Sequence, residues 1–151
     1  MAQEIAAELP VVPVYPFEGP PYYPFQQWAR RAETLLQSPL GIMMHPDHGL
    51  WHSYRFALLG DEFETAGTLP LGESPCLNCE AKPCLHSCPV EAFDGSGYDV
   101  DRCAAYLKQS PQADCNTRGC LARYACPVAP GLRYTAAQSQ FHLRAFLDAR
   151  K

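Results

Sequence analysis

The stretch "CLNCEAKPCLHSCPV", residues 76–90, contains four cysteines within thirteen residues and a proline directly after the last of them. Four more cysteines follow before residue 127, whereas the first 75 residues contain none. The chain therefore has two parts of different chemistry. We expect the second part to fold around its cysteines, and the spacing of those cysteines indicates what they bind.

The cysteine spacing predicts two iron–sulfur clusters. A 4Fe–4S cluster takes four thiolates, and in two-cluster ferredoxins the cysteine that precedes a proline binds the other cluster. Two groups end in Cys-Pro-Val here, at residues 88–90 and 126–128. This pattern predicts a first cluster held by Cys76, Cys79, Cys84 and Cys126. The second cluster would be held by Cys88, Cys103, Cys115 and Cys120.

Zinc and disulfides are the alternatives. Four residues separate Cys79 from Cys84, where the bacterial ferredoxin run has about two. Four thiolates can also hold one zinc ion, but only Cys76 and Cys79 have the tight spacing of a zinc knuckle. Disulfides are the least favoured, because the N-terminus lacks the features of a secretory signal. The residues favour two 4Fe–4S clusters.

Composition excludes several classes of function. The chain has 151 residues and a formal net charge of -4, and its basic residues are scattered, so nucleic acid is not an expected partner. No apolar run is long enough to span a membrane. Neither a nucleophile with its base nor a GxGxxG loop is evident, which favours a carrier over an enzyme. We expect a reducing compartment, either bacterial cytoplasm or the mitochondrial matrix side.

The part before the cysteines predicts an arm, a helix and two strands. Residues 1–24 should form an extended arm, because prolines alternate with Val, Tyr and Phe, and the arm should lie on a protein surface. A helix is predicted from residue 25 to Ser38, with an apolar face of Phe25, Trp28, Ala32, Leu35 and Leu36 and with Arg30 and Arg31 in solvent. Two strands at 41–45 and 50–59 would be joined by the turn 45–49, with a helix as the alternative for the second. Residues 60–75 read as a connector, so 25–75 would pack on the cysteine domain.

The cysteine part predicts three helical segments in an α+β fold. Residues 98–109 should form a helix with Val100, Cys103, Ala104 and Leu107 on one face. Residues 117–125 should add a turn or two, and 134–151 should form a closing helix with Phe141, Ala145 and Phe146 inward. We expect a dicluster ferredoxin-like core at 76–130, followed by a C-terminal helical segment at 131–151.

Several residues near the cysteines have a structural and a functional interpretation. His45, His48 and His52 are expected to cap and pack rather than bind metal, and Trp51, Tyr54 and Phe56 to belong to a core. His86 could hydrogen-bond to a cluster sulfur or lie exposed. The cations near the cysteines could raise a cluster's potential or guide an acidic partner, and otherwise are solvated loop charges. They are Lys82, Arg102, Arg118 and Arg123.

The order of these motifs resembles a known family. "LGIMMHPDHGLWHSYRFALLGDEF", then "CLNCEAKPCLHSCPVEAF", "DRCAAYL" and a final "CPV" are similar to the C-terminal part of epoxyqueuosine reductase, over residues 39–128. In that family a cobalamin-binding domain precedes a two-cluster ferredoxin domain that supplies electrons to the cobalt. The chain also resembles short stand-alone ferredoxin-like proteins of alphaproteobacterial type, through "PFEGPPYYPFQQWARRAE", "SPLGIMMHPDHGLWHSYRFAL" and "QSQFHLRAF".

The departures from the reductase shape the functional prediction. Only 44 residues precede His45, too few for a cobalamin-binding domain, and "SPLGIMM" stands where the reductase has a Gly-Lys-Asn run. The resemblance therefore implies that the electron-carrying module is kept without the enzyme site. We expect single-electron transfer between protein partners. The alternative is an accessory subunit of a larger redox assembly, such as a respiratory complex, whose clusters mainly stabilise the fold.

Overall fold

The computed structural model describes residues 1–61 and 72–150, and the chain divides into two compact units. The N-terminal unit consists of Met1–Leu35 and His52–Gly72. The cysteine unit consists of Leu36–Trp51 and Glu73–Lys151. Most of the predicted connector 60–75 lies outside the described residues.

The N-terminal unit contains a two-stranded antiparallel sheet and two helices. Strand β1 (Val12–Val14) pairs with β4 (Ala57–Leu59), and Pro13 lies opposite Leu58. Proline is tolerated there because each strand of a two-stranded sheet is an edge. Helix α1 (Ala2–Glu8) was missed by the prediction of an extended arm over residues 1–24.

Helix α2 (Phe25–Ala32) is shorter than predicted. Its C-cap Glu33 is already extended (φ -138°, ψ 156°), so the helix ends about one and a half turns before Ser38. The Glu33 carboxylate accepts a hydrogen bond from the Tyr54 hydroxyl at 2.7 Å. Arg30 and Arg31 are exposed as predicted, but the residue buried by the helix is Ala29 rather than Ala32.

The predicted hairpin between residues 41–45 and 50–59 is wrong. Strand β3 (Met43–Met44) instead pairs with β2 (Leu36–Gln37), while β4 pairs with β1 in the other unit. The turn itself is confirmed, because the backbones of His45 and Gly49 exchange two hydrogen bonds of 2.9 Å. No regular strand or helix follows it until Ala57, so the alternative of a helix over 50–59 is also wrong.

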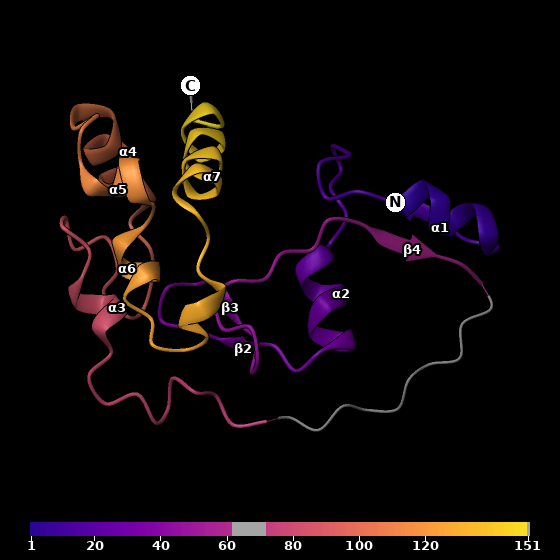
Figure 1. Cartoon of the computed structure of the whole chain (residues 1–151), viewed down its shortest axis with the longest axis horizontal. Helices are drawn as coiled ribbons and strands as arrows, with labels where there is room; N and C mark the ends of the chain where they lie inside the picture. The colour runs from indigo at the N-terminus through magenta and orange to yellow at the C-terminus, as the bar shows by residue number, and fades with distance from the viewer. Residues whose placement is uncertain (62–71, 151) are drawn as a thin grey trace. The chain divides into compact units, whose positions relative to one another are not determined.

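The cysteine unit is mainly helical, with short helices joined by tight turns (Figure 1). They are α3 (Pro83–His86), α4 (Val100–Gln109), α5 (Asp114–Arg118), α6 (Leu121–Tyr124), the 3-10 turn η1 (Pro130–Leu132) and α7 (Ala136–Asp148). Helix α3 packs on α6, and α5 packs on α7 and α6. With the two small sheets, these helices make the chain an α+β protein.

Helix α4 confirms the prediction for residues 98–109. The Asp99 side chain caps it by accepting a 2.9 Å hydrogen bond from the Arg102 backbone, and Ala104 and Leu107 are buried on one face. The predicted short helix over 117–125 is broken at Gly119, which has φ +104°. A Cβ at Gly119 would lie 2.6 Å from the Ser139 Cβ of α7, so this crossing requires glycine.

The expected inward face of the closing helix is partly wrong. Helix α7 is present, but Phe141 is 60% exposed and Ala145 is exposed, whereas Phe146 is half-buried as predicted. Ser139 is the residue of α7 that is buried, because it faces the close approach at Gly119. The helix is rotated relative to the predicted face. None of the described helices is both long and apolar enough to cross a membrane.

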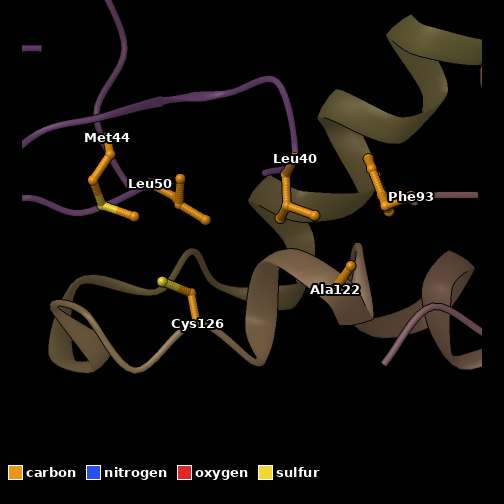
Figure 2. Close-up of a cluster of buried hydrophobic side chains, with 6 residues drawn as sticks. All are labelled: Leu40, Met44, Leu50, Phe93, Ala122 and Cys126. Carbon is orange, nitrogen blue, oxygen red and sulfur yellow. The ribbon is translucent and has the colours of Figure 1, made fainter. Parts of the chain in front are cut away.

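The core of the cysteine unit joins the segment before residue 52 to the cysteine segment (Figure 2). Met44 and Leu50 are each only 1% exposed. The remaining buried members of this core are Leu40, Phe93, Ala122 and Cys126. One residue of the apolar core is therefore also a predicted ligand.

Candidate metal centre

Four of the eight cysteines surround a large cavity in the cysteine unit. Its volume is about 510 Å³, and the thiols that line it are those of Cys88, Cys103, Cys115 and Cys120. Cys103 lies on α4 and Cys115 on α5, while Cys120 immediately precedes α6 and Cys88 follows α3. We call these four residues the larger cysteine set.

The other four cysteines lie together around a much smaller space. Cys76, Cys79, Cys84 and Cys126 line a cavity of about 20 Å³, room for roughly one water molecule. Cys84 lies on α3, and Cys126 follows α6 and is 5% exposed. We call these four residues the smaller cysteine set.

These two sets have the membership that the sequence predicts. Cys88 is separated from its sequence neighbours Cys76, Cys79 and Cys84, and Cys126 from Cys115 and Cys120. Each of the two cysteines that cross to the other set, Cys88 and Cys126, is followed by a proline. None of the eight cysteines forms a disulfide.

Polar groups next to the larger cysteine set favour the thiolate form. The Ala92 backbone N–H lies 3.3 Å from the Cys88 sulfur. The Leu121 and Arg123 backbone N–H groups act to lower the pKa values of the Cys115 and Cys120 thiols, respectively, and the Tyr98 hydroxyl does so for the Cys103 thiol, in each case against a larger effect of burial. Donors of this kind stabilise a thiolate, which is the form of cysteine that binds a metal.

Burial opposes the same ionisation. It raises the pKa of the Cys120 thiol to about 11, and the neighbouring cysteines add to the shift. It also raises the pKa values of Cys84, Cys103, Cys115 and Cys126. Four thiolates this close repel one another, so a positively charged centre among them is needed to hold them all ionised.

The two sets differ in how well they fit a cluster. The larger set offers four sulfurs, a backbone donor to the Cys88 sulfur and a volume large enough for a group of several atoms. The smaller set offers four sulfurs around a cavity of only about 20 Å³, so its lining would have to move apart to admit a cluster. Among the described residues, no three His, Cys, Asp or Glu side chains are placed to hold a single metal ion.

Arg123 has a structural position that the sequence did not reveal. Its guanidinium lies 4.5 Å from the ring centres of both Trp51 and Tyr134. It also donates to the Leu50 carbonyl, with Nε at 3.1 Å and Nη2 as a second donor. Arg123 thus ties the segment before residue 52 to α6, at the wall of the larger cavity.

We expect Arg123→Ala to lower the free energy of unfolding by about 2 to 3 kcal/mol, because it removes two cation–π contacts and leaves the Leu50 carbonyl without these donors. Chemical denaturation measures the change. The matched control is Arg118→Ala: Arg118 is exposed and lies 3.9 Å from Asp114, so its loss should cost less than about 1 kcal/mol. Equal effects of the two changes would contradict the anchoring role.

The other cations lie on the surface. Arg102 pairs with Asp99 at 3.3 Å, and Lys82 is exposed at the start of α3 with φ +37°. His86 is exposed as well. Exposure of this kind fits both solvated loop charges and cations that guide an acidic partner, so the two interpretations of these residues stay open.

The remaining histidines and aromatic residues are placed as capping and packing residues. The His45 Nδ1 accepts hydrogen bonds from the backbones of Asp47 and His48, at 3.0 and 3.2 Å, which closes the turn 45–49. His52 belongs to the N-terminal unit and contacts Tyr54 edge-on. Trp51 is buried as predicted, whereas Tyr54 and Phe56 are half-buried.

Tyr98 is the site residue that sequence reasoning missed. A signal was present: Tyr98 directly precedes the helix cap Asp99, and Cys103 is the fourth residue of α4. Side chains at these two positions commonly meet in a hydrophobic staple. The contact with Cys103 follows from that geometry.

Comparisons of the chain with protein-family models, with curated proteins and with solved structures gave no match.

Proposed function

We propose that the chain is an iron–sulfur electron-transfer protein with a dicluster ferredoxin-like core at residues 76–130. Each cysteine set holds one 4Fe–4S cluster in this proposal. The observation that supports it is the crossed sorting of eight thiols into two groups of four, in which Cys88 and Cys126 change places. That crossing is the ligand pattern of two-cluster ferredoxins.

A bound 4Fe–4S cluster supplies one-electron oxidation and reduction. The chain's own residues supply the rest. Eight cysteines provide the ligands, the Ala92 backbone N–H provides a donor to the Cys88 sulfur, and Leu40, Phe93 and Ala122 exclude water nearby. Partners would be redox proteins in a reducing compartment, where free thiols persist.

A second candidate is an accessory subunit of a larger redox assembly, with clusters that stabilise the fold without cycling. Exposed aromatic side chains on the N-terminal unit favour it. Phe17 is 74% exposed and Tyr22 is 65% exposed, and large aromatic residues are enriched at protein interfaces. These side chains would contact the neighbouring subunit.

Metal analysis and EPR spectroscopy of protein purified without oxygen test both candidates. Electron transfer predicts about eight irons per chain, as two 4Fe–4S clusters require, and reversible reduction with two interacting EPR signals. Eight irons without reversible reduction would favour the accessory subunit. Stoichiometric zinc, or protein without bound metal, would overturn the iron–sulfur proposal.

A further inference from the structure

We propose that Gly49 is a positioning residue for the smaller cysteine set: its close approach to Val128 fixes the path of the chain beyond Cys126, and with it the place of the Cys126 thiol. The inference rests on the proposed function and goes beyond it, because it names a residue outside the ligand loops on which only one of the two sets depends. It follows from the geometry of the turn 45–49 and of the Cys-Pro-Val step at residues 126–128.

The turn 45–49 is held by its own backbone and by the core on either side. The backbones of His45 and Gly49 exchange two hydrogen bonds of 2.9 Å. Met44 and Leu50, which flank the turn, are each 1% exposed, and both line the cavity of the smaller set. Because interiors are closely packed, the turn cannot shift without disturbing these buried side chains.

Gly49 is the point at which this turn meets the segment that follows Cys126. Its φ is +57°, and a Cβ at this position would lie 2.9 Å from the Val128 carbonyl oxygen, 3.3 Å from the carbonyl carbon and 3.2 Å from Cγ1. The first two are backbone atoms, which no change of rotamer can move away. A side chain at residue 49 would therefore have to displace the Val128 backbone.

A displacement of Val128 would reach Cys126 through Pro127. Proline has a fixed φ and restricts the residue before it, so this step has little freedom to absorb a shift. The Cys126 end is also held, because its N–H donates to the Arg123 carbonyl at 3.3 Å and its carbonyl accepts from Arg133 Nη2 at 3.4 Å. A shift at Val128 should therefore change the backbone angles at Cys126 and the direction of its thiol.

The larger cysteine set lacks this support. None of the described residues 43–50 lines its cavity, whereas Met44, Leu50 and Val128 all line the cavity of the smaller set. A change at Gly49 that acts through Val128 should therefore disturb the smaller set and spare the larger one.

The experiment is iron analysis with EPR spectroscopy of full-length Gly49→Ala protein, purified without oxygen and then exposed to an iron chelator. We expect this variant to retain about four irons per chain under conditions in which wild type retains about eight. Cysteine substitutions in the same variant identify the surviving cluster. A further Cys79→Ala change should still leave about four irons, whereas a further Cys103→Ala change should leave none.

Gly41→Ala is the matched control. Gly41 also has a positive φ, +72°, but a Cβ there would meet no atom within 4 Å. Alanine therefore introduces similar backbone strain at both positions and a collision only at Gly49. Gly41→Ala should retain as much iron as wild type. Equal losses in the two variants would show that backbone strain is the cause, and would overturn the inference.

Val128→Ala tests the same contact from the other side, and it decides the matter if Gly49→Ala does not fold. It removes the Cγ1 that lies beside Gly49, so the smaller set should lose its iron to the chelator before wild type does. Val90→Ala is the same truncation at the Cys-Pro-Val step of the other group, and it should leave that iron in place.

Wild-type iron retention in both Gly49→Ala and Val128→Ala would overturn the inference and leave the proposed function standing, as would loss of iron from the larger set alone. Wild-type protein that binds no iron would overturn both.

Discussion

Replacing Cys88 with alanine should remove the iron of the larger cysteine set and spare that of the smaller set, although Cys88 lies in the same loop as three ligands of the smaller set. The reason is the crossing: its thiol lines the cavity of Cys103, Cys115 and Cys120. Iron should fall from about eight to about four per chain, as expected for the loss of one 4Fe–4S cluster. Iron analysis of anaerobically purified protein measures the change.

Cys126→Ala provides the reciprocal test. It should also leave about four irons, but the surviving cluster should be that of the larger set. A second cysteine substitution identifies the survivor: Cys126→Ala combined with Cys103→Ala should bind no cluster, whereas Cys126→Ala combined with Cys79→Ala should keep about four irons. The opposite pattern would show that each loop binds its own cluster, without the crossing.

Leu50→Ala should lower the free energy of unfolding by about 2 to 5 kcal/mol, the usual cost of truncating a fully buried leucine. Leu50 is 1% exposed and belongs to the same core as Cys126. A change of this size is a large part of the stability of an ordinary domain. We also expect iron to be released faster from the smaller set, because the cavity left behind lies beside one of its ligands.

Leu77→Ala is the control for Leu50. Leu77 lies between two cysteines of the smaller set but is 75% exposed. Its truncation should change the unfolding free energy by less than about 0.5 kcal/mol. Chemical denaturation followed by circular dichroism compares the two variants. Similar losses would show that the core of the cysteine unit does not depend on Leu50.

The features that were predicted correctly, the two cysteine sets and helix α4, are each marked by a clear motif in the sequence. The order and spacing of the cysteines, with proline after Cys88 and Cys126, predicted the same two sets that the structure brings together. The cap at Asp99 and the apolar positions of 98–109 predicted α4. The signal for α4 lies within the helix and its cap. The signal for the two sets lies in the order of the cysteines and in the two Cys-Pro steps, which indicate the crossing although Cys76 and Cys126 are 50 positions apart.

The missed features depend on distant partners. Strand β4 pairs with β1, which lies more than 40 residues before it in the chain. Strands β2 and β3 are close in the chain but have two residues each, too few to show an alternating pattern. The inward face of α7 depends on where Gly119 passes Ser139. The place of Arg123 depends on aromatic rings 72 residues before it and 11 residues after it, which no local pattern specifies.

The core of the cysteine unit combines residues that are synthesised at different times. Leu40, Met44 and Leu50 are translated early, yet the buried residues that cover them include Ala122 and Cys126. At 5 to 20 residues per second, roughly 4 to 15 s pass between the synthesis of Leu50 and that of Cys126. During that interval the three apolar side chains lack their partners, so a nascent chain stalled before residue 122 should be a substrate for chaperones. Cys126 completes this core, and under the proposed function the smaller cysteine set could bind its metal only after the same late residue is made.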